Sequence, residues 1–277
     1  MAIRTIFSMV EDCARGERQG WTEFVRDFAG IARCLLAQYF PLLAPDPDKH
    51  VVAVFRRAGI EDGTVFAALK FTNEREFMMV FRELVFAYGR EQWRRTLQGT
   101  AGSPILPPDL TLDQVRAVMK DLNVLEQELL WLVIKGYDAQ QIADIMMNAS
   151  ATAEAVKCIA DERLANLVLG KTPAVIAASA LVLIQLAEQS KSDQCLPLKT
   201  FNNLVNGQIS WREREQAEEH MRTCLYCIDR LTSFQEMIRL RKDVKALDPA
   251  QVGVILDQLP IAAAKPRGIL ARLFASR

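Results

Sequence analysis

The sequence predicts an all-α fold. Along most of the 277 residues, apolar side chains recur at spacings of three and four, and the alternation typical of β-strands is scarce. Hydrophobic residues make up 50% of the chain and charged residues 25%, so the chain can bury cores and does not have the composition of a disordered protein. Proline and glycine divide the helical stretches into several modules.

The first module, residues 1–97, is expected to be helical. Apolar residues form one helical stripe within Trp21–Leu43, and three prolines from Pro41 onward end that helix. A second helical block follows at Val51–Leu97. Residues 98–109 are predicted to be a linker, because they contain two glycines, three prolines and a single charged side chain.

Residues 110–170 predict a helix-turn-helix module. An apolar face within Leu122–Val133 indicates one helix, and Gly136 ends it. Asp138 precedes Gln141 by three residues, which is the spacing of a capping box and indicates the start of a short second helix. After one more turn, a third helix is expected to run to the end of the module.

The remaining chain is divided into a linker helix at residues 171–192, a small helical module at residues 193–241 and a basic tail at residues 242–277. In the small module, Asn206–Gly207 predicts a turn, and the segment Ser210–Glu213 has capping-box spacing and predicts a new helix. The last twenty residues of the tail contain basic side chains and no acidic one.

Cysteine and histidine residues gather in the small module at the spacing of a metal site. The pattern His-x3-Cys-x2-Cys brings three ligands close together, and a cysteine 25 residues upstream can be returned to them by an antiparallel pair of helices. The alternative, that these side chains only pack as small apolar groups, is less favoured because the chain has only six Cys and two His. Four protein ligands are typical of a structural zinc site. The predicted Zn²⁺ ligands are Cys195, His220, Cys224 and Cys227.

The segment Cys195–Leu231 resembles the zinc-binding domain of zinc-binding anti-sigma factors. The shared features are an upstream ligand, the Asn-Gly-Gln turn at Asn206–Gln208, a helix rich in Glu and Arg, and the His-x3-Cys-x2-Cys motif. In that family the first ligand is often His or Cys, so the resemblance implies that Cys195 takes this place. It also implies a sigma factor or RNA polymerase as the partner.

The segment Leu122–Leu167 is similar to the fourth conserved region of sigma factors of the extracytoplasmic-function type. The matching frame comprises the run of leucines that ends at Leu132, the stretch Lys135–Ala143 and then Val156–Lys157. The block Trp21–Leu97 is similar to the second region of these proteins in length and helical texture. The resemblance implies a sigma-factor-like regulator that works with core RNA polymerase on promoter DNA.

Two groups of residues are candidates for DNA binding. The resemblance implies that the helix after the second turn of the helix-turn-helix reads DNA. On the last part of the first module, cations and aromatic rings interleave, which is typical of surfaces that stack and neutralise single-stranded DNA. The alternative for this second group is that the rings are core and the arginines are solvated. The candidate residues are Thr152, Lys157, Arg90, Trp93, Arg94 and Arg95.

Charge leaves two functions open. Lys plus Arg and Asp plus Glu each total 34, and the segment from Leu110 to Lys171 has six basic and nine acidic residues. Because affinity for DNA depends on neutralising phosphates, the helix-turn-helix starts at a disadvantage. The first hypothesis is a sigma-factor-like regulator with a fused zinc module. The second is an interaction protein that binds a sigma factor or RNA polymerase without reading DNA.

Other classes of protein are not indicated. The sequence has no nucleophile motif, phosphate-binding loop or paired-carboxylate signature, so an enzyme is not expected. No secretory signal is recognisable at the start, and the longest uncharged stretch, Thr172–Ala187, is shorter than the roughly 20 residues of a membrane span. We therefore expect a cytoplasmic protein without a membrane partner, in a compartment where thiols stay reduced.

Overall fold

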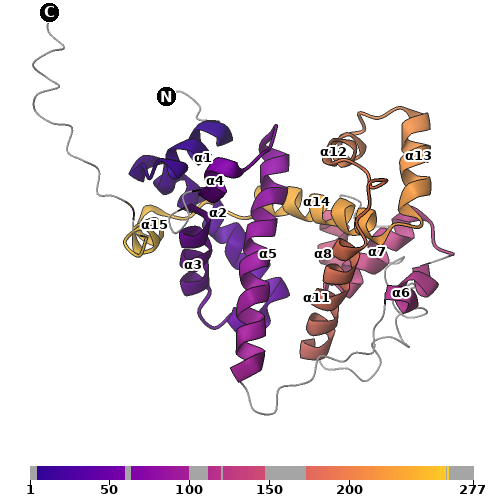
Figure 1. Ribbon diagram of the computed structural model, residues 1–277, viewed down its shortest axis with the longest axis horizontal. Coiled ribbons are helices and arrows are strands. Elements are labelled where there is room, and N and C mark those ends of the chain that lie inside the picture. The colour runs from indigo at the N-terminus through magenta and orange to yellow at the C-terminus, as the bar shows by residue number, and fades with distance from the viewer. Residues whose placement is uncertain are drawn as a thin grey trace, which may run out of the picture. The chain divides into compact units, whose positions relative to one another are not determined.

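The computed structural model describes residues 5–59, 64–99, 112–119, 121–146, 173–259 and 261. All regular elements among these residues are helices, and no strand is present in these ranges, which confirms the predicted all-α fold (Figure 1). Contacts between residues divide the chain into two compact units. Unit 1 comprises residues 1–34, 45–88 and 244–277, and unit 2 comprises residues 35–44 and 89–243.

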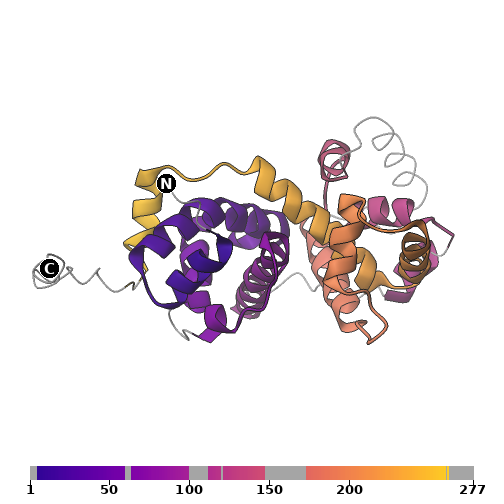
Figure 2. The same ribbon diagram turned by 90° about the horizontal axis from the view of Figure 1, so that it is seen from above.

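Unit 1 is a bundle of helices around an aromatic core (Figures 1 and 2). Seven of its buried rings contact one another in stacked, tilted and edge-on pairs. Its helices are α1 (Ile6–Ala14), the first part of α2 (Arg18–Tyr39), α3 (Pro47–Gly59), α4 (Thr64–Ala68), the first part of α5 (Glu74–Gly99) and α15 (Pro249–Leu256). The rings are Trp21, Phe24, Phe28, Phe55, Phe66, Phe77 and Phe81.

Trp21 is the central side chain of this core. Its indole Nε1 donates a hydrogen bond of 3.1 Å to the carbonyl oxygen of Cys13, so α2 is tied to the end of α1. A Cβ atom added at Gly59 would lie 2.2 Å from Cζ2 of Trp21. Glycine at the end of α3 therefore lets that helix approach the indole ring.

Helix α15 was not expected from the sequence. It lies within residues 242–277, which the sequence analysis named as a basic tail. Asp248 accepts a hydrogen bond from the amide of Gln251, and the Gln251 side chain accepts one from the amide of Asp248, so a capping box begins the helix. The amide of Leu247 donates to the carbonyl of Arg26, which joins this segment to α2 within unit 1.

Unit 2 is organised around one long helix, α14 (Leu225–Asp243). In Figure 1 this helix lies horizontally, with α12 and α13 above it and α11 below it. It packs against α7, α8, α11, α12 and α13. The other helices of the unit are α6 (Leu112–Met119), α7 (Val124–Ile134), α8 (Ala139–Ile145), α11 (Pro173–Gln189), α12 (Leu198–Asn206) and α13 (Trp211–Met221), together with the short 3-10 helix η1 (Pro41–Leu43) and the last parts of α2 and α5.

The local signals read from the sequence begin and end several helices of unit 2. Capping boxes at Asp138 and Ser210 begin α8 and α13, as predicted. Gly136 (φ 87°) follows α7, and Gly207 (φ 66°) ends α12. Both glycines have left-handed backbone conformations that other residues rarely adopt, so they fix these turns.

Some of the predicted organisation lies outside the described residues. Helices α7 and α8 have the order and the turn expected for the start of the helix-turn-helix, whereas its third helix falls within residues 147–172. Most of the linker at residues 98–109 also lies outside the described ranges. These features, and the module boundaries proposed from the sequence, remain predictions. Among the described helices, none is long and apolar enough to cross a membrane.

Candidate metal centre

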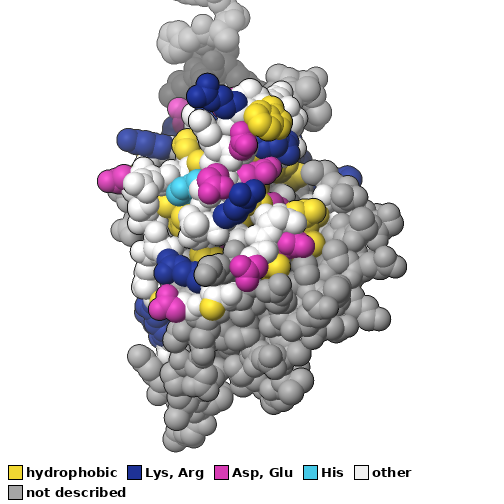
Figure 3. Space-filling view, turned by 90° about the vertical axis from the view of Figure 1, so that its right-hand side faces the viewer, with side chains coloured by type: hydrophobic (Ala, Val, Ile, Leu, Met, Phe, Trp, Pro, Cys, Tyr) yellow, Lys and Arg dark blue, Asp and Glu magenta, His cyan; other side chains and the backbone are white. Residues whose placement is uncertain are grey.

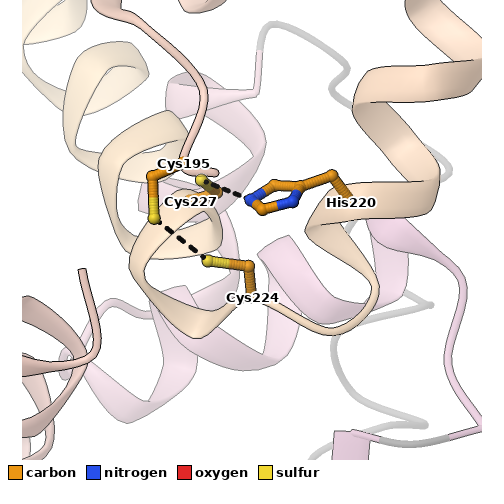
Figure 4. A group of neighbouring side chains, drawn as sticks. All are labelled: Cys195, His220, Cys224 and Cys227. Atoms are coloured by element: carbon orange, nitrogen blue, oxygen red, sulfur yellow. Dashed lines mark hydrogen bonds between the residues drawn. The ribbon is translucent and has the colours of Figure 1, made fainter. Parts of the chain in front are cut away.

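Four side chains of types that can bind a metal ion come together in unit 2 (Figure 4). Cys195 comes from the loop before α12, and His220 comes from the last turn of α13. Cys224 lies in the turn between α13 and α14, and Cys227 lies in the first turn of α14. Their candidate ligand atoms are all within 4.8 Å of one another. The sequence prediction that these four residues meet is therefore confirmed at the level of a group that can hold a metal ion.

Two of the distances between donor atoms are close to those of a tetrahedral site. Cys195 Sγ lies 3.7 Å from Cys224 Sγ, and His220 Nε2 lies 3.2 Å from Cys227 Sγ. Metal–sulfur bonds of about 2.3 Å and metal–nitrogen bonds of about 2.0–2.1 Å in a tetrahedron place two sulfurs roughly 3.8 Å apart, and a sulfur and a nitrogen roughly 3.5 Å apart. One ion can therefore reach all four donors with small side-chain adjustments.

Backbone amides donate hydrogen bonds to two of the three sulfur atoms. The amide of Ser192 donates to Cys195 Sγ at 3.2 Å, and the amide of Leu196 donates to Cys227 Sγ at 3.4 Å. Hydrogen bonds of this kind orient metal ligands and favour the charged thiolate, which is the form that binds a metal. The loop before α12 thus contributes a ligand and also two donors.

The thiols of Cys224 and Cys227 are electrostatically linked. A hydrogen bond with Cys227 is the largest effect on Cys224 and lowers its pKa to about 5. The same interaction, followed by burial, raises the pKa of Cys227. The first proton to leave the pair therefore leaves at a pH well below that of an ordinary thiol, which makes the group ready to bind a cation at neutral pH.

The face of α14 beyond the ligands binds the predicted helix-turn-helix. Asp229 lies two residues after Cys227, and its Oδ1 accepts hydrogen bonds of 2.9 Å from Trp131 Nε1 and from Lys135 Nζ. Lys135 also donates to the hydroxyl groups of Thr232 and Ser233, at 2.9 and 3.0 Å. Because a buried charge is costly without partners, this network fixes how α14 lies against α7.

A second group of buried polar contacts continues along α14. Glu236 accepts hydrogen bonds from the hydroxyls of Tyr39 (2.8 Å) and Tyr137. Gln235 donates through Nε2 to the carboxylate of Glu128 on α7, at 2.9 Å. Burial, as the largest effect, raises the pKa of Glu128 to about 7. The interface between α14 and α7 therefore contains several charged groups that need specific partners.

The candidate DNA-binding residues on α5 have partners within unit 2. Trp93 is buried and lies edge-on to Phe40, at 6.3 Å between ring centroids. Arg90 forms an ion pair with Glu188, and Arg95 forms one with Glu91. Arg94 is exposed and, with Arg90, lines an open cleft of about 300 Å³ between α5 and α11. The role of this group in DNA binding remains a prediction.

The two candidate residues of the recognition helix, Thr152 and Lys157, lie outside the described residues. Their proposed contact with DNA therefore also remains a prediction.

Comparisons with known proteins give no relative. No protein-family model, curated protein or solved structure matches this chain. A functional assignment therefore depends on the geometry of the candidate metal centre and of the interface between α14 and α7.

The spacing of Cys and His predicts the candidate ligands, but the sequence does not indicate the residues that hold α14 in place. Lys135 belongs to the sigma-like frame Lys135–Ala143, and Asp229 and Glu236 belong to no recognisable motif. Charged residues on a helix are usually solvated, so their type gives no sign of burial. The weak signal was the mixture of Asp229, Thr232, Ser233 and Glu236 on a helix that also contains a regular apolar pattern.

Proposed function

We propose that this protein is a sigma-factor-like transcription regulator in which a zinc-binding regulatory module is built into the helix-turn-helix unit. The observation that carries the proposal is that α14, which provides the ligand Cys227, is buried against α7 through the Lys135–Asp229 network. A regulatory module that is joined to the helix-turn-helix by such a buried interface acts within the same chain. Its effect is therefore independent of protein concentration, unlike that of a separate partner.

Zinc is the metal that this set of donors favours. Three thiolates and one imidazole are soft or borderline ligands, which select zinc over the hard cations Mg²⁺ and Ca²⁺. The four residues supply a complete tetrahedral shell, and this is the usual arrangement of a structural ion rather than a catalytic one. The ion would tie together the loop before α12, the end of α13 and the start of α14.

The partners of such a regulator are core RNA polymerase and promoter DNA. The resemblance of Leu122–Leu167 and Trp21–Leu97 to sigma-factor regions supports this assignment, and the helical order of α7 and α8 is consistent with it. The candidate contacts with phosphates are Arg94, which is exposed on α5, and Lys157 of the predicted recognition helix.

The test is a binding measurement on the full-length, zinc-loaded protein. Fluorescence anisotropy of a labelled promoter duplex is measured with and without core RNA polymerase, over a range of salt concentrations. We expect binding in the presence of the polymerase, and a lower affinity with a flatter salt dependence when Arg94 and Lys157 are both replaced by alanine. Lys242→Ala, a change at an exposed cation at the end of α14, is the matched control and should leave binding unaltered.

A second function, an interaction protein that binds a sigma factor or RNA polymerase through the zinc module without contacting DNA, is favoured by one observation. Trp211, the first residue of α13, is 75% exposed, although Trp is highly buried on average and is enriched in protein–protein interfaces. Figure 3 looks onto this side of the molecule, where basic and acidic side chains alternate. Binding to polymerase or to a sigma factor that is lost in Trp211→Ala, with no binding to DNA, would support this function and contradict the first.

A further inference from the structure

The four ligands connect two parts of unit 2 that are held in very different ways. The first part is the segment of residues 195–223, which includes α12 and α13 and which we call the metal arm. The second part is α14 together with α7. The metal arm provides Cys195 and His220, and α14 provides Cys227, with Cys224 at the junction.

The metal arm packs against α14 but has few buried residues of its own. Phe201 is the only buried residue among the nine of α12, and Ala217 and Met221 are the only buried residues among the eleven of α13. Isolated helices shorter than about 12–15 residues are only marginally stable in water, so neither helix can persist without tertiary contacts. The capping box at Ser210 begins α13 but does not fix its position.

Packing within the metal arm is also loose. A pocket of about 210 Å³, half open to solvent, lies between α12 and α13 and is lined by residues of both helices, among them Asn203 and Gln216. The polar link from the arm to α7 is a hydrogen bond of 3.2 Å from Gln127 Nε2 to the carbonyl of Arg222. Glu218 on α13 opposes Glu128 on α7 electrostatically, so it does not strengthen this contact.

Helix α14, by contrast, is fixed by contacts that contain no metal ligand. Nine of its residues are buried in addition to the ligand Cys227. Its carboxylates Asp229 and Glu236 are bound by Trp131, Lys135 and Tyr39. Further along the helix, Arg239 donates to the carboxylate of Asp144 on α8 at 3.1 Å. These contacts extend from Asp229 to Arg239, whereas the ligand of α14, Cys227, lies in its first turn.

We propose that the metal ion orders the metal arm alone, and that α14 stays docked on α7 when the metal is removed. Loss of the ion therefore changes the surface formed by α12 and α13, including exposed Trp211, without uncovering the buried face of α7. This inference rests on the proposed metal centre. It specifies which surface the metal regulates, namely the arm that a protein partner can contact.

The test is hydrogen–deuterium exchange of the full-length protein, first loaded with one equivalent of zinc and then treated with the chelator EDTA. We expect amides within residues 198–206 and 211–221 to exchange at least about tenfold faster without zinc, which corresponds to a loss of ~1.4 kcal/mol of protection. Amides within residues 124–134 and 228–243 should change less than about twofold. His220→Ala should reproduce the effect of the chelator on the arm.

Two controls make the result decisive. In the zinc-loaded protein, Asp229→Ala should speed exchange in α7 and α14, which shows that undocking is detectable. Arg212→Ala, at an exposed position of α13, should change neither part. The inference is overturned if α7 and α14 lose protection together with the arm, or if the arm keeps its protection after the bound zinc has been removed. If the protein binds no zinc at all, the proposed metal centre itself is wrong.

Discussion

Lys135 and Asp229 form an ion pair that is sealed from water. Their side chains are 0% and 1% exposed, and 2.9 Å separates Lys135 Nζ from Asp229 Oδ1. Lys135 follows α7 directly, and Asp229 lies in the second turn of α14. Because either charge alone would be buried without compensation, the pair makes the two helices dependent on each other.

Replacing Asp229 by alanine should therefore destabilise the protein severely. The change leaves the ammonium group of Lys135 buried and removes the acceptor of Trp131 Nε1. We expect a loss of about 3–5 kcal/mol in the free energy of unfolding, measured by urea denaturation of the zinc-loaded protein. Arg95→Ala breaks an exposed pair with Glu91 and should cost no more than about 1 kcal/mol.

A double variant separates the charge from the packing. Lys135→Met with Asp229→Asn removes both charges and keeps an oxygen acceptor for Trp131. It should recover at least about half of the stability lost in Asp229→Ala, because no uncompensated charge remains buried. A double variant as unstable as Asp229→Ala alone would mean that the ion pair is not the source of the effect.

Glu128 should make stability depend on pH. Burial, as the largest effect, and Glu218 raise its pKa from an ordinary 4.5 to about 7, while the hydrogen bond from Gln235 opposes this. Between these two pKa values the folded protein binds a proton that the unfolded chain has released. The contribution of Glu128 to stability is therefore highest at low pH and falls as the pH rises toward 7 and just beyond, by about 1 kcal/mol between pH 6 and pH 8.

The measurement compares wild type with Glu128→Gln at pH 6, 7 and 8 in urea. Glutamine has the same shape and no charge, so the variant should gain stability relative to the wild type as the pH rises. Effects of pH on the metal ligands are common to both proteins and cancel in the difference. Parallel pH profiles for the two proteins would show that Glu128 keeps an ordinary pKa.

Ser210 should influence metal affinity although it is not a ligand. It caps α13, the helix that carries His220, and Ser210→Ala should cost the helix ~1 kcal/mol. Because metal binding and ordering of the helix are linked, we expect zinc affinity to fall roughly fivefold in a competition assay with a chromogenic chelator. Asp248→Ala removes the equivalent cap of α15 in unit 1 and should leave zinc affinity unchanged. Equal effects of the two changes would disprove the link.

Local signals in the sequence were sufficient for several helices and for the four candidate metal ligands. The spacing of His220, Cys224 and Cys227 follows helical geometry, so it could be read directly. The upstream position of Cys195 became interpretable because a turn at Asn206–Gly207 and a cap at Ser210 separate two helices. Such signals depend on residues close together in the chain.

The interface between α14 and α7 could not be predicted in the same way. Lys135 and Asp229 are 94 residues apart, and neither has a neighbouring residue that indicates burial. Which helices meet depends on the whole packing of unit 2 and not on local propensity. Helix α15 is a different case, because its Asp248–Gln251 capping box is a local signal in the sequence, whereas the basic residues that come after it indicate only a charged tail.

The most direct test of the account is the coordination of the metal in the purified full-length protein. Elemental analysis should find one zinc per chain, and X-ray absorption at the zinc edge should show three sulfur donors at about 2.3 Å and one nitrogen donor at about 2.0–2.1 Å. Cys224→Ser and His220→Ala should each lower the zinc content well below one per chain, whereas Cys34→Ser, at an exposed cysteine of unit 1, should leave it at one. A full equivalent of zinc in both ligand variants, or a shell made only of oxygen and nitrogen donors, would contradict the assignment of the metal centre.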